Sequence, residues 1–131
     1  MRKIVITTTK EKAVPVEELD RLRHMSFLQW LDQGMKVSSL YGGTTENFSR
    51  YLNDKVVFVA HDASTGELLA MHNLKLNKRK GCAWGANLAV APQAKHEGIA
   101  SRMLQEEVAQ LKKRGYRYIR ETTGVPATWS V

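Results

Sequence analysis

The sequence predicts an α+β domain, in which a mixed and mostly antiparallel β-sheet is flanked by helices. Two features predict this class: three apolar segments separated by short polar turns between residues 56 and 90, and an amphipathic segment that lies between the last of them and a further strand. The chain has 131 residues, of which 43% are hydrophobic and 25% are charged. That composition is typical of one globular domain, so we expect a single domain over residues 1–131.

The first half of the chain opens with a strand and two helices. Ile4–Thr9 is short and rich in β-branched residues, which favours a strand. Apolar residues recur at helical spacing over Val16–Leu31, which predicts a helix there. Thr44 is suited to cap a second, shorter helix, because Phe48 and Leu52 lie four residues apart and share one face.

A three-stranded meander follows. Val56–Ala60, Leu68–Leu76 and Cys82–Val90 are apolar runs of strand length. The segments between them, Asp62–Gly66 and Asn77–Gly81, are short, polar and end in glycine, as in antiparallel hairpin turns.

The last part predicts one βαβ unit. Ala91–Glu97 is expected to be an irregular loop, and Gly98 to open a helix that Gly115 ends. Tyr116–Thr122 then forms a strand, which a right-handed crossover places parallel to Cys82–Val90. The apolar face predicted for this helix consists of Ile99, Met103, Leu104, Val108 and Leu111.

Charge and cysteine content restrict the function classes. The net charge of +7 fits an anionic ligand, a nucleic acid or an acidic protein, and its clusters Lys78–Lys80 and Lys112–Arg114 each fit a solvated surface. Cys82 is the only cysteine, so we expect no disulfide, no cysteine–zinc cluster, no other metal site and a cytoplasmic location. No apolar run approaches the roughly 18 residues of a membrane span, and no signal peptide is evident.

The strand-to-helix connection before Arg102 carries the clearest functional signal. A helix that starts on small residues exposes backbone N–H groups and the positive end of its dipole, which suits a pyrophosphate. Gly98 and Ala100 allow phosphate oxygens close to the backbone, and Lys95 and Arg102 can add charged hydrogen bonds. The alternative is that Gly98 merely permits a tight turn.

The six residues Lys95-His96-Glu97-Gly98-Ile99-Ala100 resemble the acetyl-CoA motif of the GNAT superfamily, Q/R-x-x-G-x-G/A. Gly98 and Ala100 match, whereas Lys95 stands where Gln or Arg is usual and lacks their planar fork. The flanking segments Leu88–Pro92 and Ser101–Leu104, and the order of elements, are also similar to the family pattern.

The resemblance implies an N-acetyltransferase that passes the acetyl group of acetyl-CoA directly to an amine. In such a fold the backbone of Leu88–Val90 pairs with the pantetheine arm, and amides up to Ser101 hold the pyrophosphate. The implied cofactor-binding residues are Leu88, Ala89, Val90, Lys95, His96, Glu97, Gly98, Ile99, Ala100, Ser101 and Arg102. Of these, Glu97 fits better as a helix cap or a solvent-facing residue than as a base.

Catalytic residues are harder to assign. Asn87 precedes the pantetheine segment and can face the acceptor through a water, and His72 titrates near neutrality, so these two are the catalytic candidates. The family usually continues with another helix, which commonly carries a tyrosine that protonates the leaving thiolate, and with two more strands. Ala127–Val131 resembles the start of that helix, so we expect a truncated domain whose last strand has an open edge that favours homo-oligomers.

Two other functions stay open at this point. A module of the same fold could hold CoA without transferring the acetyl group, because we expect the final elements of the family to be absent. A nucleic-acid-binding domain would fit the sequence pI of 9.7, but aromatic residues are not interleaved with the basic clusters. The acceptor amine is not identified by the sequence.

Overall fold

The computed structural model describes residues 2–32, 44–121 and 127–130, with residues 27–32 and 127–130 described for the backbone alone. One sheet of six strands runs in the order β1-β2-β3-β4-β5-β6. The elements are β1 (Ile4–Thr8), α1 (Val16–Asp32), α2 (Thr45–Leu52), β2 (Val56–Asp62), β3 (Leu68–Asn77), β4 (Cys82–Val90), the 3₁₀ turn η2 (Pro92–Ala94), α3 (Ile99–Lys113), β5 (Tyr118–Glu121) and β6 (Ala127–Ser130).

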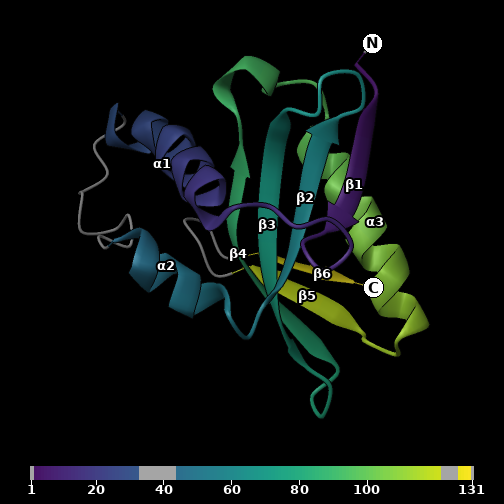
Figure 1. The fold of residues 1–131 in the computed structure, drawn as a ribbon. Helices are drawn as coiled ribbons and strands as arrows, with labels where there is room; N and C mark the ends of the chain where they lie inside the picture. Colours follow the sequence, from purple (N-terminus) through teal and green to yellow (C-terminus); the bar gives the residue numbers. More distant parts are fainter. Residues whose placement is uncertain (1, 33–43, 122–126, 131) are drawn as a thin grey trace.

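The pairing of the strands confirms the predicted mixed sheet. Strands β1 to β4 are antiparallel to their neighbours, β5 is parallel to β4, and β6 is antiparallel to β5. The segment β4–α3–β5 is therefore the predicted βαβ unit. Figure 1 shows α1 and α2 against one face of the sheet and α3 against the other.

Both layers are held by apolar packing. On the α3 side, Ile99, Met103 and Leu111 are buried, as the helical spacing predicts, and Leu104 and Val108 are partly buried. Strands β2, β3 and β4 contribute small and branched residues at the centre of the sheet, where both faces are covered. Burial of this continuous apolar area is the main source of stability.

A buried ion pair within α1 also contacts α2. Arg23 Nη2 lies 2.6 Å from Asp20 Oδ1, and Thr45 Oγ1 donates to Asp20 Oδ2 at 2.8 Å. The Arg23 guanidinium also lies 4.2 Å from the centre of the Phe48 ring. Burial favours the neutral form of Asp20, but the hydrogen bonds from Arg23 and Thr45 outweigh it and lower the pKa of this carboxyl.

The prediction for Ala127–Val131 was wrong. Residues Ala127–Ser130 form the strand β6 rather than the start of a helix. The backbone of β6 pairs with β5, so the outer edge of β5 is covered. The open edge predicted for that strand is therefore not observed. Thr128 and Trp129 are residue types that favour strands once a partner is available. Self-association through a sheet edge stays a prediction, and it now concerns β1 or β6.

Smaller differences concern boundaries and isolated groups. The predicted strand Tyr116–Thr122 spans Tyr118–Glu121, and Thr122 lies outside the described residues. The loop expected over Ala91–Glu97 contains the turn η2. Cys82 is a buried free thiol. Within the described ranges, no helix is long and apolar enough to cross a bilayer, and no cluster of His, Cys, Asp or Glu is suited to a metal ion.

Candidate functional site

The connection from β4 to α3 begins the candidate site. After η2 the chain turns through two residues with positive φ, His96 at 65° and Gly98 at 76°. Gly98 is the N-cap of α3, and a Cβ built on it would meet nothing within 4 Å. The conformation of Gly98 rather than a lack of space therefore favours glycine, and the space above it is open to a ligand.

The first turn of α3 has unpaired amides. The first helical bond runs from Arg102 N to Gly98 O, at 3.1 Å. The N–H groups of Ile99, Ala100 and Ser101 precede it and have no partner within the helix. No side chain caps this end, and no acidic residue lies in its first turn. The end is therefore electropositive and suited to an anion.

The second feature is an unpaired edge of β4. Cys82 to Gly85 pair with β5 in parallel register, and the pairing stops at Gly85 and Glu121. Beyond that point, no described strand pairs with this edge, while the other edge of β4 continues to pair with β3 as far as Val90. The sheet thus forks between β4 and β5. An extended ligand can hydrogen-bond to such an edge as an added strand does.

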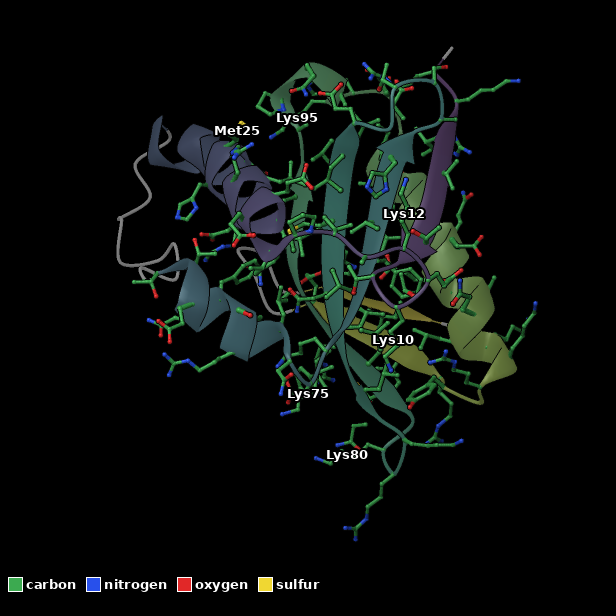
Figure 2. All side chains as sticks on the ribbon, viewed as in Figure 1. Lys10, Lys12, Met25, Lys75, Lys80 and Lys95 are labelled. Carbon is green, nitrogen blue, oxygen red and sulfur yellow. The ribbon has the colours of Figure 1, made fainter. Side chains whose placement is uncertain are left out.

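A cavity of about 360 Å³ connects the two features. It lies between the end of β4, α1 and the start of α3, and Figure 2 shows Lys95 at this end of the sheet. Most of the predicted cofactor-binding residues line it. The lining consists of Ser26, Leu88, Val90, Ala94, Lys95, His96, Gly98, Ile99, Ala100 and Ser101. Ala89 is fully buried, so only its backbone could serve a ligand.

The two remaining predicted residues, Glu97 and Arg102, line a neighbouring cavity of about 590 Å³. There Arg2 Nε donates to Glu97 Oε1 at 3.0 Å, and Arg2 Nη1 donates to Asp62 Oδ2 at 3.1 Å. Glu97 consequently does not cap α3, which was one of the roles expected for it. Its ion pair ties the loop before α3 to the start of β1.

Asn87 occupies an irregular point of β4. The register between β3 and β4 shifts between Met71 and Asn73, so that His72 faces both Asn87 and Leu88, as in a β-bulge. Asn87 has a positive φ of 55°. Because an asparagine tolerates this conformation better than most residues, the bulge suits its position.

The Asn87 side chain belongs to a buried polar chain. Its Nδ2 donates to Asn73 Oδ1 at 2.8 Å, and Asn73 Nδ2 donates to the Tyr51 hydroxyl at 3.3 Å. Asn87 Oδ1 is buried and lacks a hydrogen-bond partner in the described part of the chain. A buried oxygen of this kind calls for a donor, such as a water or an ammonium group.

His72 lies on the opposite face of the sheet, between two carboxylates. Its Nδ1 is 2.7 Å from Glu107 Oε1 of α3, and its Nε2 is 2.7 Å from Glu121 Oε2 of β5. The side chains of His72 and Glu107 are fully buried, and that of Glu121 is 7% exposed. Gly85 leaves the necessary room, because a Cβ on it would lie 2.7 Å from His72 Nε2.

The two carboxylates set the charge of His72. Burial alone would lower the pKa of the imidazole, but its hydrogen bonds to Glu107 and Glu121 raise the pKa to about 9. Burial also raises the pKa of the Glu107 carboxyl, against the effect of His72. His72 is therefore a buried cation at neutral pH, and both of its nitrogens are engaged.

The basic turn Lys78–Lys80 lies away from this site. Figure 2 shows Lys80 at the end of the sheet opposite to Lys95. The nine residues of β4 separate the two ends, about 30 Å at the usual rise of a strand. A phosphate ligand at α3 therefore does not account for this cluster.

Four residues near the site had not been singled out: Tyr51, Asn73, Glu107 and Glu121. The residue spacing offers a signal for Glu107, which lies four residues after Met103 and four before Leu111 and is buried with them, although it is not part of the predicted apolar face. Asn73 lies in the middle of an apolar strand, where a buried polar side chain requires a partner. The identity of these partners depends on the tertiary structure.

Comparison with known proteins now defines the class. A sequence model of the Acetyltransferase (GNAT) family matches residues 17–129. The chain therefore belongs to the GNAT acetyltransferase family. No match is found among curated protein sequences.

Solved structures confirm the fold. A GNAT family acetyltransferase from Brucella melitensis in complex with acetyl-CoA has a TM-score of 0.71 at 16% identity, over 99% of this chain and 89% of that one. The PaiA N-acetyltransferase from Thermoplasma acidophilum in complex with coenzyme A gives 0.67 at 20% identity, over 91% and 78%. A GNAT family acetyltransferase from Staphylococcus aureus Mu50 gives 0.69 at 15% identity, over 92% and 74%.

Proposed function

We propose that the protein is an N-acetyltransferase that binds acetyl-CoA between α3 and the free edge of β4 and transfers the acetyl group directly to a primary amine. The observation that carries the proposal is the junction of two features: an uncapped helix start at Gly98 and a strand edge that is unpaired beyond Gly85. One feature suits a pyrophosphate and the other suits an amide-bearing chain such as pantetheine. Structures of GNAT family members with acetyl-CoA or coenzyme A share this fold.

Different residues bind the different parts of acetyl-CoA. In this proposal the amides of Ile99, Ala100 and Ser101 hold the pyrophosphate, and the cations of Lys95 and Arg102 add attraction. The backbone of Leu88, Ala89 and Val90 pairs with the pantetheine arm along the 360 Å³ cavity. The thioester then lies in the fork between β4 and β5, near the bulge at Asn87.

Transfer requires that the amine reach the thioester on its open side. The amine nitrogen forms a bond to the acetyl carbon, the carbon–sulfur bond breaks, and the proton lost by the amine balances the thiolate of CoA. In this proposal the buried Asn87 Oδ1, which has no hydrogen-bond partner among the described residues, accepts a hydrogen bond from the incoming amine or from a water beside it. Holding the two reactants in one fork supplies most of the expected acceleration.

We assign His72 a positioning role. Its ring is engaged on both sides, so it has no free nitrogen to accept a proton from the amine. It links β3 to α3 and β5 directly behind the fork. The cluster with Glu107 and Glu121 thereby fixes the separation of β4 and β5, which sets the width of the thioester site.

Binding is tested by calorimetric titration of the protein with acetyl-CoA and CoA. Gly98→Glu should abolish binding, because a carboxylate would occupy the anion site. Gly66→Glu is a matched control, since Gly66 has the same φ of 76° and the same open surroundings, in the turn between β2 and β3, none of whose residues lines either cavity. Equal loss in both variants, or none in either, would count against the assignment.

Transfer is tested by measuring CoA release with a panel of primary amines. Direct transfer predicts initial-velocity lines that intersect when both substrates are varied, whereas an acetylated enzyme gives the parallel lines of a ping-pong scheme. Saturable binding without turnover of any amine would instead indicate a CoA-binding module without transferase activity.

A further inference from the structure

An exposed arginine, Arg120, lies beside the fork and has no acidic partner among the described residues. The Arg120 guanidinium of β5 is 5.2 Å from the centre of the Trp84 ring and 5.8 Å from that of Tyr118. Elsewhere in the described chain, Arg2 and Arg23 pair with carboxylates. No described carboxylate lies within ion-pair distance of Arg120, whose contacts are the two aromatic rings.

Arg120 lies on the face of the sheet opposite to the buried cluster of His72, Glu107 and Glu121. Trp84 and Arg120 are partners in the parallel register. The next pair, Gly85 and Glu121, is the last one before the fork. Successive side chains of a strand point to opposite faces, so Arg120 projects away from the buried Glu121. His72 and Glu107 fill the far side of the fork, whereas Arg120 is exposed and Trp84 is partly exposed. An amine that approaches the fork thus passes this surface.

The strand register fixes the spacing between Asn87 and the row of residues that holds Arg120. Asn73 and Lys75 lie two residues apart on the same face of β3, and Lys75 is the register partner of Trp84. Asn87 lies three residues beyond Trp84 on β4. Two to three residues correspond to about 7 to 10 Å along a strand. Along the strands, the backbone position of Asn87 is therefore about 7 to 10 Å from the row that holds Arg120.

We propose that the acceptor is a primary amine that also carries a carboxylate or similar anionic group, which Arg120 binds between Trp84 and Tyr118. The inference rests on the proposed transferase function and names its substrate class. The two rings restrain the guanidinium without neutralising it, so its planar donors stay available to an anion.

The test compares acceptors that differ only in the anionic group. ε-Aminocaproate and n-hexylamine share the amine and the chain length, and further pairs vary the length of the chain. We expect kcat/KM for the anionic member to exceed that of its neutral partner by about 10- to 100-fold, the effect of one charge-assisted hydrogen bond. The preference should disappear in Arg120→Gln and recover in part in Arg120→Lys.

Arg117→Gln supplies the matched control. It removes the same charge three residues earlier, near Gly81, at the end of the sheet away from the fork. This variant should keep the preference for anionic acceptors. All three variants should bind acetyl-CoA as the unmodified protein does.

The outcomes separate the two proposals. A protein that binds acetyl-CoA but turns over neutral amines equally well, or turns over none of the anionic ones, overturns the acceptor class alone. The same holds if Arg120→Gln and Arg117→Gln reduce the preference equally, because net charge would then explain it. A folded protein that does not bind acetyl-CoA overturns the transferase function itself.

Discussion

Replacing Glu107 with glutamine should lower the pKa of His72. Two carboxylates at 2.7 Å hold the imidazole in its charged form against a burial that favours the neutral one. Glu107→Gln leaves only Glu121, while the burial of the ring is unchanged. The pKa should therefore fall from about 9 toward the ordinary value of 6.5.

The same shift makes stability depend on pH. The folded-state pKa of His72 lies above its unfolded value, so the stabilisation is complete below about pH 6.5 and is lost as the pH rises through 9. A shift of about 2.5 units corresponds to a loss of about 3 kcal/mol over this window. The pKa of the Glu107 carboxyl is raised as well, so its ionisation also lowers stability as the pH rises, beginning above the ordinary value of 4.5. In Glu107→Gln the loss should be clearly smaller.

The assay is an NMR titration of the imidazole together with urea unfolding between pH 6 and 10. Glu106→Gln is the control, because Glu106 is exposed on the same helix and does not contact His72. A His72 pKa at or below 6.5 in the unmodified protein would refute the reasoning. So would a pKa that Glu107→Gln leaves unchanged.

Three further substitutions test the packing. Gly85→Ala places a methyl group 2.7 Å from His72 Nε2 and should lower the free energy of unfolding by about 1–3 kcal/mol; an unchanged urea midpoint would contradict this. Asp20→Asn leaves Arg23 without its buried counter-charge and should cost about 3 kcal/mol, and a loss below about 1 kcal/mol would show that the pair is effectively solvated. Thr44→Ala removes the side-chain cap of α2, a 3.1 Å bond, and should cost about 1 kcal/mol by thermal unfolding; no change would mean that water replaces the cap.

Features that are local in sequence could be predicted. The hairpin turns, the capping Thr44 and the glycine before α3 all act within a few residues, and the structure has them where the sequence indicates. The segment from Ala127 could not be predicted in this way. Four residues have little intrinsic preference, and pairing with β5 decides their conformation.

In the candidate site, too, the local features could be predicted from the sequence and the long-range contacts could not. The loop from Lys95 to Arg102 could be recognised because its chemistry is concentrated in one segment. His72 could not, since its two partners lie 35 and 49 residues away and only the packing of α3 and β5 brings them together. Arg120 likewise had no signal until the register placed Trp84 beside it.

The central claim is that α3 and the free edge of β4 together hold acetyl-CoA. The most direct test follows backbone amide shifts and hydrogen exchange by NMR as acetyl-CoA is added. We predict saturable shifts and new protection for Ile99–Ser101 and for residues 86–90, with no change in the turn Lys78–Lys80. Saturable binding that instead perturbs that turn, or leaves the start of α3 unchanged, would contradict the account.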